Sequence, residues 1–135
     1  MELSVWFPGK KKVDVAVGSF VIHTDQSFAH GGDGTAPEPF DLFLASIGAC
    51  AGLYVLGFCQ SRNISTERIR IEQKADIAKG TLSKVTLTVH VPPGFPTKYL
   101  QALVTAASGC AVKRAMDARP EIAVQAVQAG EQARA

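Results

Sequence analysis

The longest apolar segment of the chain runs from residue 42 to residue 59. These eighteen residues carry no charged side chain, and three glycines and two cysteines are spaced through them. A helix that is apolar around its whole circumference must be buried on every side. We therefore predict one long, buried helix over residues 37–62.

Signals for a helix start precede this segment. Thr35 stands three positions before Glu38, which is the spacing of a capping box, and prolines at 37 and 39 suit a first helical turn. We expect Thr35 to cap the helix. Within it, Gly48 and Gly52 are expected to let another helix or a sheet approach closely.

A membrane span is the alternative interpretation of the same segment. Eighteen uncharged residues reach the lower limit for crossing a bilayer, and Gly48 with Gly52 forms a G-x-x-x-G pair. The other segments of the chain are amphipathic, however, and need an apolar partner that a central helix supplies. We favour a helix buried in protein and expect no membrane association.

Alternating and β-branched segments lie on both sides of the helix. Residues 2–7, 13–17 and 20–24 predict an antiparallel meander before it, and a glycine-rich loop follows them. Residues 68–77 and 85–91 predict a hairpin after it, with its turn at Lys79-Gly80.

The pattern of the C-terminal part of the chain predicts helices followed by an extended segment. We predict helices over 96–107 and 110–118, interrupted at Ser108-Gly109, a last strand over 122–127 and a frayed tail over 130–135. The whole chain, residues 1–135, is then a single α+β domain. One sheet covers only one flank of the long helix, so we predict a homodimer in which two such helices pack together.

Composition narrows the classes of function. Hydrophobic residues make up 47% and charged residues 19%, and the formal net charge is +2, which does not favour a nucleic-acid partner. Residues 1–20 show no signal-peptide pattern, and three cysteines are not a secreted disulfide framework. We expect a cytoplasmic protein. Its Cys and His spacing resembles no zinc site, and we expect neither metal nor cofactor.

The three cysteines differ in their surroundings. Cys50 lies mid-helix, where a cysteine is usually an inert packing residue. Cys59, nine residues further at about 100° per residue, faces roughly the other side and is predicted to be core. Cys110 follows a helix break, and a helix N-terminus favours a thiolate there, with Lys113 and Arg114 one turn on. From these residues alone, Cys50 stays either inert or reactive.

Two motifs resemble the OsmC/Ohr family. Residues 39–50 read P-x-D-L-x-L-A-S-x-G-A-C, which is similar to the central-helix signature of that family, and residues 108–115, S-G-C-A-V-K-R-A, resemble its second cysteine motif. The order of the predicted elements also matches, so the resemblance covers nearly the whole chain. It implies an OsmC-like intertwined homodimer in which long central helices are wrapped by antiparallel sheets, with active sites at the interface.

The resemblance also implies a chemistry. Members of the Ohr and OsmC branches are thiol-dependent peroxidases that reduce organic hydroperoxides. By that resemblance Cys50 is the peroxidatic cysteine, Cys110 resolves its sulfenic acid to a disulfide, and a thiol reductant restores both. An apolar interface pocket for the hydroperoxide would be lined by Phe40, Phe43 and Leu44.

The chain departs from the Ohr branch at both activating positions. The arginine that stabilises the thiolate in that branch has no clear match, because no arginine precedes Arg62. That branch carries a glutamate ten residues before its first cysteine, and here the position is Phe40, followed by Asp41. This resembles the divergent OsmC-like branches. We take Asp41, Lys10 and Lys113 as further candidates for activating Cys50. The second hypothesis is an OsmC-fold protein that binds a small molecule or serves as an accessory factor, with non-catalytic cysteines.

Overall fold

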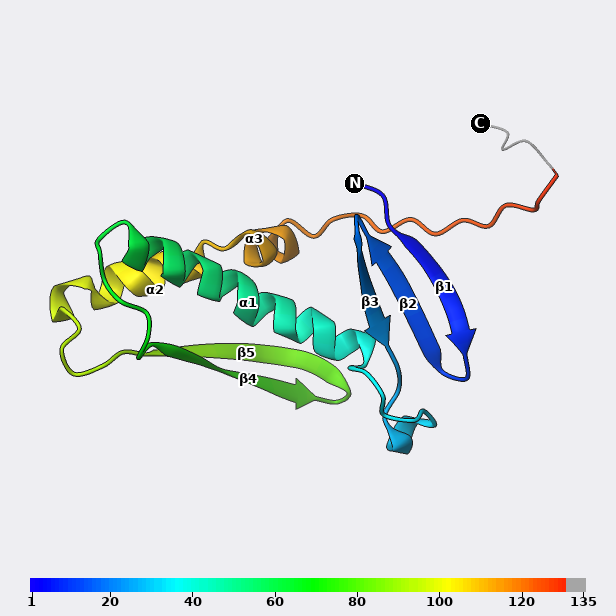
Figure 1. Ribbon diagram of the computed structural model, residues 1–135, viewed down its shortest axis with the longest axis horizontal. Coiled ribbons are helices and arrows are strands. Elements are labelled where there is room, and N and C mark those ends of the chain that lie inside the picture. Colours follow the sequence, from blue (N-terminus) through cyan, green and yellow to red (C-terminus); the bar gives the residue numbers. More distant parts are fainter. Residues whose placement is uncertain (131–135) are drawn as a thin grey trace.

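The computed structural model describes residues 1–130 of the chain as an α+β fold with one long helix and two antiparallel sheets (Figure 1). The elements are, in order, β1 (Ser4–Gly9), β2 (Lys12–Val17), β3 (Phe20–Thr24), the 3-10 turn η1 (Phe28–His30), α1 (Pro39–Gln60), β4 (Arg70–Ala78), β5 (Thr81–His90), the 3-10 turn η2 (Thr97–Tyr99), α2 (Leu100–Ser108) and α3 (Ala111–Asp117).

The N-terminal sheet is the predicted meander. Its strands pair in the order β1-β2-β3, all antiparallel, and Figure 1 shows the sheet near the N-terminal end of α1. Large apolar side chains of this sheet are exposed, among them Phe7 and Phe20 at 80% and 73%. The sheet therefore carries apolar surface that its own chain leaves uncovered.

The second sheet is the predicted hairpin of β4 and β5, which runs along α1 (Figure 1). Its turn residues, Lys79 and Gly80, both have positive φ, as a two-residue type I′ turn requires. A register shift between Asp76 and Ile77 interrupts the alternation of the strand, and Ile77 is 56% exposed.

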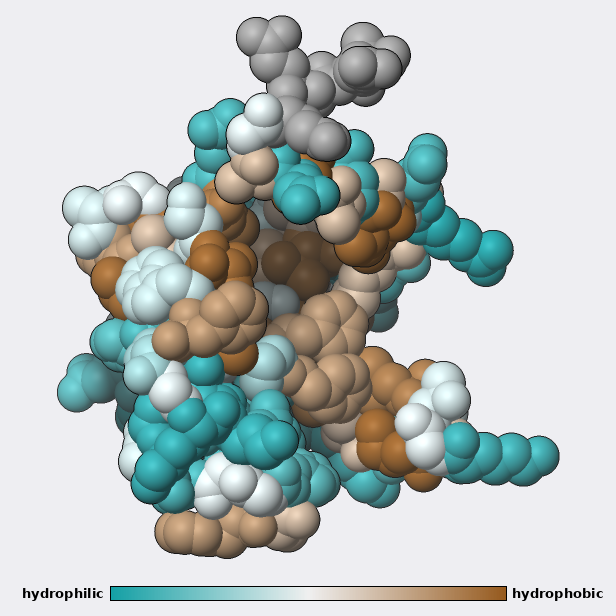
Figure 2. Space-filling model, turned by 90° about the vertical axis from the view of Figure 1, so that its right-hand side faces the viewer, coloured by the Kyte–Doolittle hydropathy of each residue, from teal (hydrophilic) through white to brown (hydrophobic). Residues whose placement is uncertain are grey.

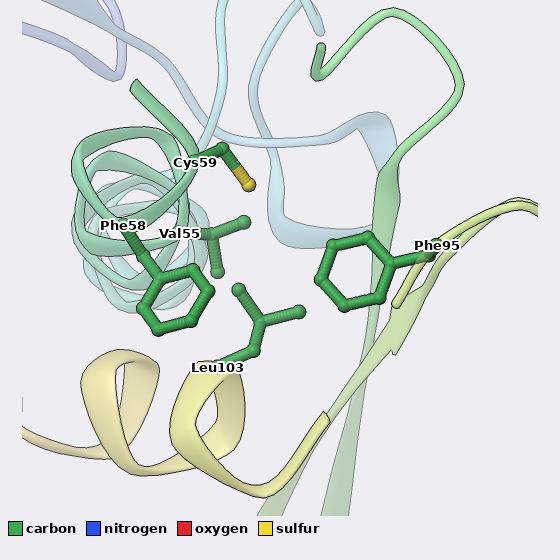
Figure 3. Close-up of a cluster of buried hydrophobic side chains, with 5 residues drawn as sticks. All are labelled: Val55, Phe58, Cys59, Phe95 and Leu103. Atoms are coloured by element: carbon green, nitrogen blue, oxygen red, sulfur yellow. The ribbon is translucent and has the colours of Figure 1, made fainter. Parts of the chain in front are cut away.

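The core lies between one stripe of α1 and the elements that follow it. Val55, Phe58 and Cys59 of α1 pack with Phe95 and with Leu103 of α2, as Figure 3 shows. On another part of α1, Leu53 is 62% exposed. The chain therefore covers part of α1 and leaves apolar side chains of this helix, such as Leu53, open.

By length and composition alone, α1 also qualifies as a membrane-spanning helix. Core helices of water-soluble proteins pass the same test, so the observation is weak evidence. Only 28% of its most apolar 18-residue window is buried within the chain.

The start of α1 differs from the expectation. The helix begins at Pro39 and ends at Gln60, and its N-cap is Glu38, not Thr35. Glu38 and Asp41 form a reciprocal capping box in which the Glu38 amide donates to Asp41 at 3.1 Å. Thr35 is engaged elsewhere, because its hydroxyl donates to the buried carboxylate of Asp25 at 2.7 Å.

The C-terminal elements confirm the predicted break between two helices and correct the first helix and the last strand. A 3-10 turn and then α2 replace a continuous helix from residue 96, and α3 follows the predicted break. The strand predicted over 122–127 is wrong, because the segment forms no ladder with any strand among residues 1–130 and is exposed. A strand needs a partner for its backbone groups, and the described chain offers none there. Most of the tail predicted to fray, residues 131–135, lies outside the described residues.

Candidate active site

Cys50 lies at the middle of α1, where α3 packs against that helix. Cys110 is the N-cap of α3, in extended conformation, and its side chain is buried at 1% exposure. The backbone N–H groups of Val112 and Ala111 and the Cys110 thiol lie near enough to the Cys50 sulfur to act on its pKa. The first turn of α3 thus brings together the two cysteines that stand sixty positions apart in the sequence.

These contacts lower the pKa of the Cys50 thiol from its ordinary value. The Val112 N–H contributes most, and the Cys110 thiol, the Ala111 N–H and the positive charge of Arg114 act in the same direction, while partial burial opposes them. A lowered pKa increases the fraction of thiolate, which is the nucleophilic form. We expected the free N–H groups of α3 to act on Cys110; they are directed at Cys50.

Arg114 is a site residue that sequence reasoning placed beside Cys110 but not beside Cys50. Its Nη2 donates to the Tyr54 hydroxyl oxygen at 3.2 Å. Tyr54 lies four residues after Cys50 on α1, so both side chains share one face of that helix. This (i, i+4) spacing was visible in the sequence, but only tertiary packing shows that α3 covers this face.

Cys59 plays no part in this arrangement. It is fully buried in the core cluster, and burial raises the pKa of its thiol. All three cysteines are free thiols. The structure therefore separates a core cysteine from a pair that share one environment.

A cavity of about 500 Å³ adjoins Cys110. Cys110 and Lys113 belong to its wall, and the other wall residues, mostly apolar, come from α1, β5 and α2: Ile47, Val85, Leu87, Thr88, Val89, Leu100, Leu103, Val104, Ala107 and Ser108. Apolar side chains also gather around a hollow on the face of the molecule shown in Figure 2. The cavity has room for a small organic molecule beside Cys110.

The expected pocket residues are not part of this cavity wall. Phe40 and Phe43, at the start of α1, are exposed, with ring centroids 5.7 Å apart, and the Leu44 carbonyl accepts a hydrogen bond from Gln73 at 2.8 Å. The pocket they are expected to line is one between two subunits, so this expectation stays a prediction.

The candidate activating residues have partners of their own. Asp41 caps α1, and Lys10, in the turn between β1 and β2, forms an ion pair with Asp33 at 3.0 Å. Lys113 contributes to the cavity wall and pairs with Asp117 at 2.8 Å, which raises its pKa. Of these three, Lys113 is the one that the chain itself brings next to Cys110.

Among residues 1–130, no group of three or more His, Cys, Asp and Glu side chains is arranged to hold a metal ion.

Comparisons with solved structures identify proteins of similar fold. Among solved structures it is similar to an OsmC-like protein from Mycoplasma pneumoniae (11% identity, TM-score 0.70, covering 87% of each chain). It is also similar to the organic hydroperoxide resistance protein OsmC from Legionella pneumophila (21%, 0.57, covering 85% of this chain and 87% of that one). A third is the organic hydroperoxide resistance protein OhrB of Bacillus subtilis (23%, 0.58, 87% and 90%). At these identities the likeness shows the fold.

No curated protein matches the sequence significantly. The family model of the OsmC-like proteins matches residues 32–125, which is more than half of the chain. The chain therefore belongs to the OsmC-like protein family.

Proposed function

We propose that this protein is a thiol-dependent peroxidase that reduces organic hydroperoxides through Cys50 and Cys110. The observation that carries the proposal is the Cys50 sulfur itself. The backbone N–H groups of Val112 and Ala111 at the start of α3 and the Cys110 thiol lower the pKa of Cys50. Two similar structures are organic hydroperoxide resistance proteins, which supports the same substrate class.

The reaction begins at the Cys50 thiolate. Its sulfur attacks the outer oxygen of the hydroperoxide, the O–O bond breaks, and the alkoxide leaves and takes up a proton to become an alcohol. Cys50 is now a sulfenic acid, oxidised by two electrons. The backbone N–H groups of Ala111 and Val112 stabilise the thiolate before this step.

Cys110 then resolves the intermediate. Its sulfur attacks the Cys50 sulfur, the S–O bond breaks, and hydroxide leaves with the Cys110 proton as water. The product is a Cys50–Cys110 disulfide. A dithiol reductant returns both thiols by exchange and is itself oxidised to a disulfide, which closes the cycle.

The substrate in this proposal is apolar. The cavity beside Cys110 is walled mainly by Val, Leu and Ala side chains of β5 and α2, which suits an alkyl or aryl group. The exposed apolar surface of α1 supports a homodimer in which the two long helices meet. Phe40, Phe43 and Leu44 would then complete the pocket at the interface. A single OsmC-like domain in the cytoplasm is the form we propose.

The test is peroxide turnover by the reduced, full-length protein. With cumene hydroperoxide and a dithiol, the wild type is expected to consume peroxide, and a single turnover without reductant is expected to leave a Cys50–Cys110 disulfide visible by mass. Cys50→Ser should abolish consumption, while Cys110→Ser should accumulate a sulfenic acid that dimedone traps. Cys59→Ala is the matched control and should keep the activity. A Cys50→Ser variant as fast as the wild type would refute the proposal.

The alternative is a binding or accessory protein whose cysteines are not catalytic. The cavity of about 500 Å³ favours it, because the cavity has room for a ligand without any chemistry. In that case an apolar fluorescent probe such as 1-anilinonaphthalene-8-sulfonate would bind, and peroxide would leave both thiols reduced. The lowered pKa of Cys50 argues for the peroxidase.

A further inference from the structure

We propose that Arg114, held by the hydroxyl of Tyr54, is the cation that stabilises the Cys50 thiolate in this protein. The inference rests on the proposed function and names the activating residue of that site. Arg114 would act directly on the reacting sulfur, whereas Tyr54 would be a positioning residue that acts through Arg114.

The placement of these side chains follows from two helical spacings. Cys50 and Tyr54 are four residues apart on α1, and Cys110 and Arg114 are four residues apart at the start of α3, where the Arg114 amide donates to the Cys110 carbonyl at 3.0 Å. Each pair therefore shares one face of its helix. The two faces lie against each other, because α1 and α3 are in contact and Arg114 donates to the Tyr54 hydroxyl at 3.2 Å. The Cys110 thiol accordingly acts on the pKa of Cys50.

Among the polar groups near Cys50, Arg114 is the one suited to stabilise the thiolate as a cation. On β4, the side chains that approach the same helix are Ile71 and Gln73, which are uncharged. On α3, the ammonium of Lys113 is paired with Asp117 at 2.8 Å, so its charge is largely compensated. Arg114 is the charged side chain whose field lowers the pKa of Cys50, and the Cys110 thiol is the titratable neighbour.

The chemistry of the guanidinium suits this position. Arginine stays protonated at any working pH and carries five N–H donors in a rigid plane. Tyr54 accepts from one of its nitrogens and so fixes the plane without neutralising the charge. The remaining donors are available to the thiolate and then to the alkoxide that leaves when the O–O bond breaks, where negative charge develops. Lysine, a point charge on a flexible stem, would serve less well.

The experiment measures how fast iodoacetamide alkylates Cys50 as a function of pH, followed by mass on the Cys50 peptide. Arg114→Met removes the charge and keeps the apolar stem, so the midpoint of the profile should move to higher pH. Because Arg114 is exposed and solvent screens its charge, we expect alkylation at pH 7 to slow by about threefold to tenfold. Arg114→Lys should restore part of the lost rate.

Tyr54→Phe tests the positioning role separately. It should shift the profile in the same direction by a smaller amount, and it should have no effect in the Arg114→Met background, because Tyr54 then has nothing to position. Arg119→Met removes another exposed cation from the same region and should leave the profile unchanged.

The outcomes separate this inference from the proposed function. An Arg114→Met profile that superimposes on the wild type would overturn the inference, even if peroxide is still consumed. If Arg114→Met shifts the profile but the wild type consumes no peroxide, the inference holds and the peroxidase assignment fails. Should Arg114→Met not fold, as judged by circular dichroism, Tyr54→Phe and Arg114→Lys decide: the wild-type profile in both overturns the inference, and a shift in Tyr54→Phe supports it.

Discussion

The Cys50 side chain depends on groups that the chain supplies from sixty residues away. The backbone N–H groups of Ala111 and Val112 and the charge of Arg114 lower its pKa, and none of them is close in sequence. Both cysteines were identifiable from their motifs. The sequence did not show which of the two cysteines the N–H groups of α3 act on, because that depends on how α3 packs on α1.

Gly48 is a second residue whose role depends on a distant part of the chain. Gln73 of β4 donates to the Leu44 carbonyl at 2.8 Å, and a Cβ at position 48 would lie 2.6 Å from the Gln73 Oε1. The close approach expected from the glycine spacing is therefore confirmed at this position, between α1 and β4. Gly52 is less constrained, since a Cβ there would lie 3.8 Å from the Ile71 Cδ1.

The first prediction concerns whether Gly48→Ala raises or lowers the free energy of unfolding. In the Gln73→Ala background, alanine should stabilise the helix by up to about 1 kcal/mol, because glycine is the poorer helix former. In the wild type the new Cβ displaces Gln73 and breaks its hydrogen bond, which contributes about 0.5–1.5 kcal/mol, so the gain should vanish or reverse. Urea unfolding of the four proteins measures both effects. Equal effects of Gly48→Ala in the two backgrounds would contradict the contact.

At the scale of elements, the alternation and turn signals predicted the strands well. The meander, the hairpin with its Lys79-Gly80 turn, the long helix and the break before α3 all appear. The predictions that failed, the Thr35 cap and the strand over 122–127, depend on which groups these residues find as hydrogen-bond partners. Thr35 did not cap α1 because Asp25 takes its hydroxyl. Residues 122–127 formed no strand because alternation describes side chains, whereas a strand also needs a neighbour for its backbone.

The attachment of α2 to α1 gives the second prediction. Leu103 is 1% exposed in the core cluster, and its neighbour Val104 is 50% exposed. Leu103→Ala should lower the free energy of unfolding by about 2–5 kcal/mol, because it leaves a cavity in the core. Val104→Ala should cost less than about 1 kcal/mol, since little burial is lost. Both are measured by urea denaturation. Similar losses from the two variants would mean that α2 does not pack on α1 as described.

For the whole molecule, the uncovered side of α1 is the feature that needs explaining. Leu53, Phe40 and Phe43 are all exposed along this helix, and the N-terminal sheet leaves further apolar side chains open. Large exposed apolar patches are typical of interaction surfaces. A membrane and a second copy of the chain are the two candidates for covering this surface. The Cys50 site lies on the same helix, which is consistent with a second copy of the chain.

The last prediction distinguishes these two occupants. Without detergent, the wild type should sediment as a dimer in analytical ultracentrifugation at micromolar concentration. Leu53→Lys places an ammonium on the open side of α1, where the partner helix would have to bury it without a counter-ion, so the variant should sediment as a monomer. Gln101→Lys, on an exposed position of α2, adds the same charge and should stay dimeric. A wild type that needs detergent to remain in solution would favour the membrane. A Leu53→Lys variant that remains dimeric would place the interface on another surface, with the exposed N-terminal sheet as the next one to test.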